Sequence, residues 1–405
     1  MHVAVLGAGV TGIATAWFLS RQGHDVTVFE RYDSVASGTS FANAGQLAYS
    51  YVNAMASPEF VAKIPRIVLG RDRGSRFEMR AGLEFGRWIL QFLAQSTAGR
   101  ARKNTLALLP VAMKSEALMR ELRDTLSLNF DFRSHGKLVM LRSASDIDNA
   151  QRIADLKRKQ GCETEIISNQ QATVLEPALS QMNGGYTAAV FAPGDHLGDA
   201  AKFSIELAEV LQRDYAVTFR MREAIERIKI RSGRIAAIKT IHDEVPVDAA
   251  VACLGVWSDE LLRPLHIRTH ICPIRGYSMT LPAGPHTPTL SVTDTHQRIV
   301  FSRLGQRARI TGFADFVGFN TDGDRERTAS LYELARKTAP LAADYEATRR
   351  NRWGGFRPMT PNGIPLAGPT KIDGLYLNTG HGSLGWTLAL ATAEKVAGYV
   401  GSKES

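Results

Sequence analysis

The sequence has 405 residues, of which 44% are hydrophobic and 22% are charged, and its formal net charge is +9 at pH 7. These values are typical of globular proteins, they exclude a disordered or low-complexity chain, and the length exceeds that of one ordinary domain. No apolar run reaches the roughly 18 residues of a membrane-spanning helix, no secretory leader precedes the first apolar stretch, and three widely spaced cysteines exclude a disulfide framework. We therefore expect a protein of the reducing cytoplasm.

The N-terminus carries the pattern of a dinucleotide-binding unit. A buried strand is predicted over residues 2–6, followed at once by the glycine turn of residues 7–12, a helix up to Gly23, and a second strand over 26–29 that ends at Glu30. In this pattern the first glycine allows a tight turn, the second lets the backbone approach a pyrophosphate, and the third lets helix and strand pack closely. The helix N-terminus then presents unpaired N–H groups and a positive dipole end to the phosphates.

An acidic residue completes this pattern. Glu30 lies eighteen residues after Gly12, where a carboxylate can accept hydrogen bonds from both hydroxyls of an adenosine ribose. An acid at this point disfavours a 2′-phosphate, which leaves NAD or FAD as the dinucleotide. The cofactor contacts predicted for this part of the chain are Gly7, Gly9, Val10, Thr11, Gly12, Glu30 and Arg31.

Residues 59–103 form a basic segment. It holds ten Lys/Arg and four Asp/Glu, so its net charge of +6 is two thirds of the net charge of the chain. Apolar side chains between residues 77 and 93 recur at three- and four-residue spacings, as in an amphipathic helix. Three interpretations are open at this point: a core-facing helix with a solvated basic rim, a surface that contacts anionic lipid headgroups, and a nucleic-acid surface.

The middle of the chain predicts a second kind of sheet. Residues 270–313 alternate apolar and polar side chains with many breakers, which favours an antiparallel sheet over a wound one. No second glycine fingerprint occurs, and this argues against an enzyme that holds both FAD and NAD. Before this region, the pattern predicts a helix over 200–213 and strands over 217–221, 225–230, 235–241 and 251–255.

The C-terminal region distinguishes the two dinucleotides. A loop is predicted over 353–363, a strand over 375–378, and a glycine-rich turn over 379–386 that enters a helix ending near residue 400. The N–H groups of this second helix N-terminus can support another anionic group. A flavin has such a group, because the reduced isoalloxazine is negative around N1 and the O2 carbonyl. The sequence therefore favours FAD.

Several motifs together indicate a family. They are the N-terminal fingerprint and the segments 40–46, 193–195, 198–199, 276–278, 356–363 and 377–387. With these motifs the sequence resembles the D-amino acid dehydrogenase family, within the wider D-amino acid oxidase and glycine oxidase group of FAD-dependent amine and amino acid oxidoreductases. The resemblance covers essentially the whole chain.

The resemblance implies an α/β architecture of two domains. A doubly wound, Rossmann-like FAD-binding domain is expected from residues 1–90, 170–262 and 345–405. An α+β substrate-binding domain built on an antiparallel sheet is expected from residues 91–169 and 263–344. The resemblance also implies oxidative deamination of a D-amino acid, by hydride transfer from Cα to flavin N5, to an imino acid that water hydrolyses to a 2-oxo acid and ammonia. It implies that the electrons pass to a quinone or another respiratory acceptor rather than to oxygen.

A free amino acid brings a carboxylate, which a planar guanidinium grips with two hydrogen bonds. Arg357 is the best candidate for this anchor, and the resemblance places the anchor there as well. Tyr277 can add a hydroxyl to the same carboxylate, and Arg275 can be an additional cation. Tyr49 and Tyr51 are expected to line the substrate pocket.

The resemblance places the remaining contacts around the flavin. His381, between two glycines of the C-terminal turn, joins Arg357 and Tyr277 as a catalytic candidate, and its position suits orientation of the flavin ring better than proton abstraction. No residue is assigned as the general base, and solvent can take the proton. The predicted flavin contacts are Ser40, Asn43, Ala44, Gly45, Gln46, Ile225, Gly255, Gly380, His381, Gly382, Ser383, Leu384, Gly385, Trp386 and Thr387.

Other functions are compatible with parts of the pattern. The first is a related flavin enzyme for glycine, sarcosine or a cyclic imino acid such as D-proline or hydroxy-D-proline, because pocket size decides between these substrates. The second is a tRNA-modifying FAD oxidoreductase, motivated by the basic charge, although we expect no nucleic-acid partner. The third is a non-catalytic FAD-binding subunit, against which Arg357 argues. No metal site is expected, because His266 and His270 lack a third ligand nearby.

Overall fold

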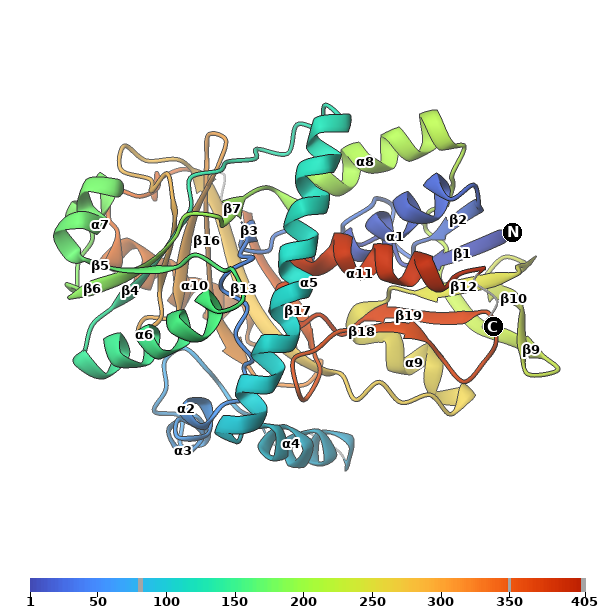
Figure 1. The fold of residues 1–405 in the computed structure, drawn as a ribbon, viewed down its shortest axis with the longest axis horizontal. Coiled ribbons are helices and arrows are strands. Elements are labelled where there is room, and N and C mark those ends of the chain that lie inside the picture. Colours follow the sequence, from blue (N-terminus) through green and yellow to red (C-terminus); the bar gives the residue numbers. More distant parts are fainter. Residues whose placement is uncertain (79–82, 349–350, 402–405) are drawn as a thin grey trace.

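The computed structural model describes residues 1–78, 83–348 and 351–401. Residues 79–82, 349–350 and 402–405, which include Arg80 of the basic segment, lie outside the described ranges. Figure 1 shows two lobes side by side, each built around its own sheet, with the long helix α5 (Ala98–Thr125) running along the junction between them.

A six-stranded sheet organises the lobe that holds both chain termini. Its strands are parallel except for the edge pair β18 and β19, which is antiparallel. In spatial order the strands are β18 (Leu366–Pro369), β19 (Leu375–Thr379), β12 (Ala249–Ala252), β1 (His2–Leu6), β2 (Asp25–Phe29) and β8 (Thr218–Arg220). This α/β arrangement confirms the predicted wound sheet, with β1 at its centre.

Both faces of this sheet are covered, which explains why β1 is apolar at successive positions. Val3 and Val5 face a core shared with helices, whereas Ala4 and Leu6 face a core shared with a small antiparallel sheet. The helices are α1 (Val10–Arg21), α8 (Ala200–Tyr215), α11 (Gly385–Tyr399) and α5. The opposite face carries β9 (Ile225–Arg231), β10 (Arg234–Thr240), β11 (Glu244–Pro246) and α9 (Ser258–Leu262).

An eight-stranded sheet organises the other lobe. It is antiparallel except for the parallel pair β14 and β4, so it is a mixed sheet. Its order is β17 (Asn351–Met359), β13 (Cys272–Pro282), β16 (Arg307–Asp315), β15 (Ile299–Leu304), β14 (Ser291–Asp294), β4 (Lys137–Leu141), β6 (Ala188–Ala192) and β5 (Glu165–Ser168). The short strands β3 (Gln46–Leu47) and β7 (His196–Leu197) pair separately.

Further helices border the second lobe. They are α2 (Pro58–Val61), α3 (Ile64–Val68), α4 (Leu83–Gln95), α6 (Ala144–Arg158), α7 (Asn169–Leu175) and α10 (Asp324–Thr338). Helix α4 buries Trp88 and Phe92 against the edge of the eight-stranded sheet, and Trp88 Nε1 donates a hydrogen bond to the carbonyl of Met359 at 3.0 Å. The interpretation of residues 77–93 as a core-facing amphipathic helix is therefore confirmed for the face of α4 that carries Trp88 and Phe92.

One predicted element is wrong. Residues 353–359 are not a loop, because residues 351–359 form β17 and pair with β13 along nine registered positions, whereas residues 360–363 are a loop as predicted. Glycine and proline predict turns, but here Gly355 pairs with Gly276 and Gly354 with Tyr277 within the sheet. Tertiary pairing overrides the local preference. The strands and helices predicted for residues 2–6, 26–29, 200–213, 225–230, 235–241 and 375–378 are present with shifts of about one or two residues at their ends.

The division of the chain into two domains at the predicted boundaries stays a prediction. Several elements lie in a different lobe from the one that the predicted boundaries give them. β6, from the segment 170–262, lies in the eight-stranded sheet. β17, from the segment 345–405, lies in the eight-stranded sheet. α5, from the segment 91–169, packs Leu108, Leu109 and Ala112 into the core beside the six-stranded sheet.

Candidate active site

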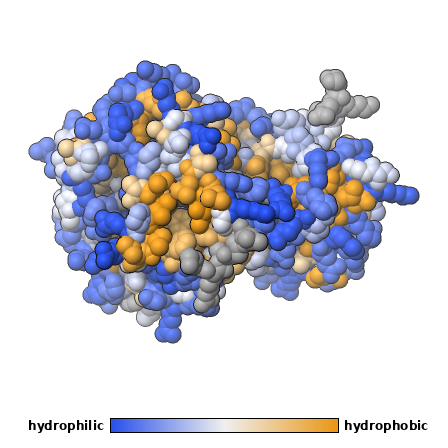
Figure 2. All heavy atoms as spheres, turned by 90° about the horizontal axis from the view of Figure 1, so that it is seen from below, coloured by the Kyte–Doolittle hydropathy of each residue, from blue (hydrophilic) through white to orange (hydrophobic). Residues whose placement is uncertain are grey.

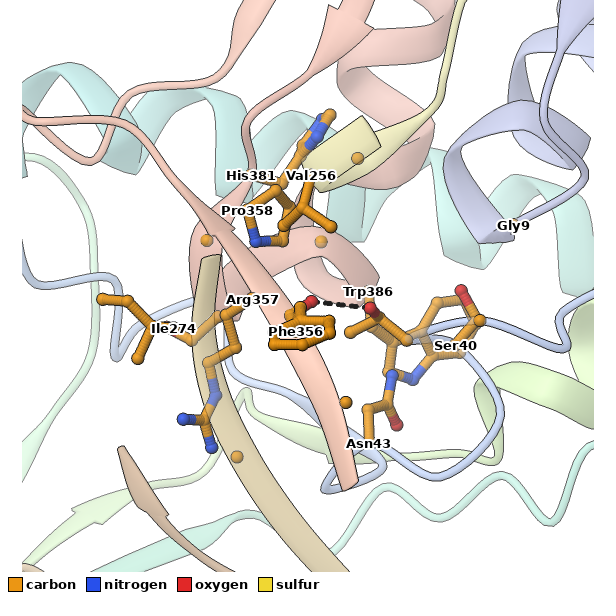
Figure 3. A pocket seen from close by; sticks show the side chains of 18 of the residues that line it. Gly9, Ser40, Asn43, Val256, Ile274, Phe356, Arg357, Pro358, His381 and Trp386 are labelled. Carbon is orange, nitrogen blue, oxygen red and sulfur yellow. Dashed lines mark hydrogen bonds between the residues drawn. The ribbon is translucent and has the colours of Figure 1, made fainter. Parts of the chain in front are cut away.

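A cavity of about 1210 Å³ extends from the glycine turn after β1 to the strands β13 and β17. Figure 3 shows part of this cavity from close by, with Arg357 and Ile274 on one side and Ser40, Asn43 and Trp386 on the other. Most of the predicted cofactor residues line this cavity: Gly7, Gly9, Val10, Thr11, Glu30, Arg31, Ser40, Asn43, Ala44, Gln46, Ile225, Gly255, His381, Gly382, Ser383, Leu384, Gly385, Trp386 and Thr387. The fold thus brings together segments from both ends of the chain.

Gly12, Gly45 and Gly380 are not among the lining residues. A methyl group on Gly12 would come 1.9 Å from the carbonyl oxygen of Gly7, so Gly12 allows α1 to pack against the turn. Gly45 and Gly380 have positive φ angles of 68° and 78°, in the region where glycine has no steric penalty. These three glycines shape the turns from behind the cavity wall.

The first glycine turn leaves a helix N-terminus open to the cavity. Gly7 has φ of 102° and its N–H donates to the carbonyl of Phe29 at 2.8 Å, which ties the turn to β2. Helix α1 begins after Gly9, which supplies no side-chain cap, and Ser40 Oγ accepts a hydrogen bond from the N–H of Val10 at 3.0 Å. The other N–H groups of this N-terminus have the geometry that binds a phosphate.

Glu30 stands at the far end of the cavity. Its two carboxylate oxygens accept hydrogen bonds from the N–H of Ala8 at 2.8 Å and of Tyr32 at 3.1 Å. These bonds fix the carboxylate beside the glycine turn, where further lone pairs remain for ribose hydroxyls. The guanidinium of Arg31 lies over the Trp257 ring at 4.3 Å from its centre, and both side chains line this end.

The second glycine turn holds the start of α11 against the cavity. Gly382 has a positive φ of 56°, and Trp386 Nε1 donates to the carbonyl of Gly198 at 3.0 Å. His381 is buried and its Nε2 lies 2.9 Å from Thr392 Oγ1. Burial lowers the pKa of His381 to about 3, so the imidazole is neutral at physiological pH and is a poor base. A role in positioning agrees with this geometry.

Arg357 projects from β17 into the cavity. Its strand partner is Ile274, its Nη1 donates to the carbonyl of Phe313 at 2.9 Å, and its side chain is half-buried with the exposed part in the cavity lining. No ion pair involves Arg357 within the described ranges. Burial lowers the pKa of the guanidinium, and the nearby Asp315 raises it. Because an arginine in a protein stays protonated, this is a desolvated cation that faces open space.

The other two polar candidates line the same cavity but are engaged by the protein. Tyr277 donates its hydroxyl proton to Asp315 Oδ2 at 3.0 Å, and burial together with Asp315 raises the pKa of Tyr277. Arg275 forms an ion pair with Asp324 and lies over the Phe356 ring at 4.2 Å. Neither group is placed as freely as Arg357 to accept a carboxylate.

Tyr49 and Tyr51, which follow the turn of residues 40–46, have different surroundings. Tyr51 lines the cavity. Tyr49 does not: it is 1% exposed, and its ring meets the edge of His196 at 5.8 Å between ring centres. The expectation that Tyr49 lines the pocket is therefore wrong, because its ring is buried against His196 instead.

Two cations that contact the turn of residues 40–46 were not predicted from the sequence. Arg309 is buried and donates from Nη1 to the carbonyl of Asn43 at 2.8 Å, while Asn43 Oδ1 accepts from the N–H of Gly45 at 2.9 Å, so the turn is held from both sides. Lys137, at the start of β4, lines the cavity and donates to Gln46 Oε1 at 3.1 Å. The only signal for Lys137 in the sequence was a charge that opens an otherwise apolar strand.

The residues present fit FAD. The cavity is continuous from Glu30 and the uncapped N-terminus of α1 to the glycine turn before α11. The glycines before α1 and α11 have no side chains that would block a long dinucleotide, and the two helix N-termini can bind its anionic groups. A pocket for adenosine alone would not need the second turn. The strands β13 and β17 then cover the end at which a flavin ring would lie.

Known proteins match this chain over nearly its whole length. The family model described as FAD dependent oxidoreductase matches residues 2–399. D-amino acid dehydrogenase 2 of Ralstonia nicotianae is 36% identical over 99% of this chain and 96% of its own length. D-amino acid dehydrogenase of Methylobacterium nodulans is 35% identical, with 99% and 95% covered. The solved structure of glycine oxidase from Geobacillus kaustophilus has a TM-score of 0.76 at 21% identity, covering 100% of this chain and 95% of that one.

Proposed function

Because this chain belongs to the FAD-dependent oxidoreductase family whose model spans residues 2–399, we propose that it oxidises D-amino acids to imino acids, which water hydrolyses to 2-oxo acids and ammonia. The chain is an FAD-dependent amino acid oxidoreductase, and the D configuration is the part proposed here, supported by the names of relatives at about 35% identity. The single observation that carries the proposal is Arg357, a half-buried arginine without an ion-pair partner in the described ranges, which faces the cavity.

Arg357 supplies the carboxylate anchor. Two parallel N–H donors of a guanidinium match the two oxygens of a carboxylate, and desolvation strengthens such a pair. The bond from Nη1 to the Phe313 carbonyl and the position over Gly276 fix the plane of the guanidinium. A substrate held in this way presents one face of Cα to the cavity, which is the physical basis of stereospecificity.

FAD, when bound in this cavity, would supply the oxidising chemistry as the acceptor of a hydride equivalent. The amine of the bound substrate has to be neutral, because an ammonium has no lone pair to form the C=N bond. The cation Arg357 and the desolvated walls disfavour a second positive charge nearby, so they lower the pKa of the substrate ammonium. His381 remains neutral and is bonded to Thr392, so it does not compete for this proton.

The electron acceptor and the membrane form a second part of the proposal. We infer that electrons leave to a quinone or another respiratory acceptor, and that residues 59–103 contact the inner face of the membrane. Among the described residues, no helix is both long and apolar enough to span a bilayer. Val68, Leu69 and Leu90 are 54%, 65% and 69% exposed. Helices α3 and α4 lie at the same end of the molecule in Figure 1, and Figure 2, viewed from that end, shows a hydrophobic patch bordered by polar surface.

A steady-state assay tests the proposed activity. The purified flavoprotein is mixed with an artificial electron acceptor and with each of a panel of D- and L-amino acids, glycine, sarcosine, D-proline and hydroxy-D-proline. Reduction of the acceptor with release of ammonia from primary D-amino acids supports the proposal. Activity confined to glycine, sarcosine or the cyclic imino acids would replace it with a related flavin enzyme, and no activity with any of them would reject it.

A further inference from the structure

One wall of the cavity holds a lysine that the reaction described above does not use. Lys137 is the first residue of β4, next to Ser291 of β14 in the sheet, and it is 3% exposed. Its ammonium donates to Gln46 Oε1 at 3.1 Å and lies 4.4 Å from the centre of the Tyr51 ring. Lys137, Gln46 and Tyr51 all line the cavity that also contains Arg357. Lys137 therefore forms part of the wall around the space available to a ligand.

This ammonium has no carboxylate partner. Within the described ranges no ion pair involves Lys137, and its contacts with Gln46 and Tyr51 leave part of its three-donor capacity unused. Burial lowers the pKa of Lys137 to about 8, because the charged form has lost water, and the more distant charge of Asp195 only partly opposes this. A buried ammonium of this kind is stabilised by any anion that reaches it.

The surroundings of Lys137 carry an excess of positive charge. Lys157 of α6 is also buried, donates to the carbonyl of Ser50 at 2.6 Å, and lies 5.5 Å from the same Tyr51 ring. Among the described residues, the buried carboxylate that interacts with both lysines is Asp195, which accepts from the N–H and the hydroxyl of Ser50 at 2.8 and 2.7 Å. Two ammoniums thus share one carboxylate that contacts neither of them directly.

Polar groups surround Lys137, and of these Gln46 and Thr293 line the cavity with it. The amide nitrogen of Gln46 donates to Ser291 Oγ and to Thr293 Oγ1, the latter at 3.2 Å. Because its amide nitrogen is held by two hydroxyls, Gln46 turns its oxygen towards Lys137, and the ammonium is held in place. The amide of Gln46 and the cation of Lys137 suit a carboxylate better than an aliphatic side chain.

From this juxtaposition we propose that Lys137 is a specificity-determining residue that binds the side-chain carboxylate of an acidic D-amino acid. The proposal rests on the proposed function and names its substrate class. Arg357 takes the α-carboxylate and Lys137 takes the distal one. Basic D-amino acids are excluded by repulsion from Lys137 and Lys157, and neutral side chains leave the ammonium without its anion.

Matched substrate pairs test the proposal, because each acid and its amide have the same shape. The value of kcat/KM is measured for D-glutamate against D-glutamine and for D-aspartate against D-asparagine, with D-2-aminoadipate as a longer acid. For at least one pair the acid is preferred by about 10-fold or more. The variant Lys137→Met removes the charge at similar length and abolishes this preference, with a loss of about 10- to 100-fold for the acid and little change for the amide.

Lys157→Met is the matched control, since Lys157 is equally buried but does not line the cavity. It keeps the acid preference, and the FAD content and melting temperature of both variants confirm that they fold. The proposal is overturned if no acid is preferred over its amide, or if Lys137→Met changes acid and amide by the same factor. Turnover of neutral D-amino acids alone would overturn only this inference, whereas turnover of no D-amino acid would overturn the proposed function as well.

Discussion

The guanidinium of Arg357 lies directly over the Cα of Gly276, so closely that a methyl group added at residue 276 would come 2.5 Å from Nη2 and 2.6 Å from Cζ. Gly276 is on β13 and Arg357 is on the neighbouring β17. The absence of a side chain at residue 276 therefore creates the space in which the proposed carboxylate anchor rests, and the glycine determines where the anchor points.

We predict that Gly276→Ala displaces this anchor. Its φ angle lies outside the left-handed region, so an alanine brings steric overlap with Arg357 and no backbone strain. KM for the amino acid is expected to rise by about 10- to 100-fold, because a guanidinium moved by one or two ångströms loses its paired contact with the carboxylate. Steady-state kinetics measure this, and FAD absorbance shows that the cofactor remains. A variant with the wild-type KM would show that the guanidinium need not rest over residue 276.

The N-terminal turn predicts a stability effect. Gly12→Ala places a methyl group 1.9 Å from the carbonyl oxygen of Gly7, and this oxygen belongs to the backbone and cannot rotate away. We expect a loss of at least about 2–3 kcal/mol in the free energy of unfolding and a fall in bound FAD. Thermal unfolding and the ratio of flavin to protein absorbance measure both effects.

Gly99→Ala is the control for that variant, because Gly99 lies in α5 with nothing within 4 Å of an added methyl group. It should leave FAD content unchanged and stabilise the protein by up to about 1 kcal/mol, since alanine is the better helix former. Equal stability of the Gly12→Ala protein and the wild type would contradict the tight packing of α1 on the turn.

A pH dependence is expected from the lysine at the cavity wall. Burial and the neighbouring Lys157 lower the pKa of Lys137 to about 8, Asp195 opposes this, and Gln46 and Tyr51 complete its surroundings. The ammonium is present below this pKa and is lost as the pH rises through it. The ratio of kcat/KM for the preferred acid to that for its amide should therefore fall above pH 8.

Taking the ratio removes the ionisation of the substrate amine, which is common to both members of the pair. In Lys137→Met the ratio should be low and independent of pH between 7 and 10. A wild-type ratio that stays constant through this range would mean that no group near the side-chain carboxylate titrates there.

The basic segment predicts salt-dependent binding to anionic vesicles. Leu69 at the end of α3 and Leu90 of α4 are exposed. The cations Lys63, Arg66 and Arg87 of the same segment are exposed as well, and Arg87 forms an ion pair with Glu84 at 3.2 Å. Reversal of these three charges to glutamate should lower co-sedimentation with phosphatidylglycerol-containing vesicles by about tenfold or more, at roughly 1 kcal/mol per charge. Activity with a soluble acceptor should stay unchanged. Binding that is equal for both proteins would remove the lipid contact from the proposal.

Local patterns predicted those parts of the molecule that local chemistry determines. The strand, glycine turn, helix and acid from His2 to Glu30 are close in sequence and have fixed periodicities, so each was found, and the second glycine turn before α11 was found in the same way. β17 was not predicted because its glycines and prolines favour a loop locally. They form a strand only by pairing with β13, about 80 residues earlier in the sequence, and a local pattern does not contain this information.

The site was harder to predict where function depends on contacts between distant residues. Tyr49 and Tyr51 are equivalent in sequence, yet only Tyr51 reaches the cavity. Arg275 has the residue type of an anchor, but Asp324, 49 positions away, neutralises it. Lys137 and Gln46 are 91 positions apart, and their contact depends on the pairing of β4 with β14. Residue type alone does not distinguish a cation that has a partner from one that faces open space.

Anaerobic flavin reduction tests the central claim most directly. The purified, FAD-loaded protein is mixed in a stopped-flow instrument with the D or the L enantiomer of its best substrate, and the same is done with Arg357→Met. We predict that the flavin absorbance bleaches rapidly with the D enantiomer and not with the L enantiomer, and that Arg357→Met keeps its FAD but requires at least about 100-fold more substrate for the same rate. Bleaching by the L enantiomer at the same rate, or an unchanged substrate dependence in Arg357→Met, would contradict the claim that this guanidinium holds a D-amino acid before the flavin.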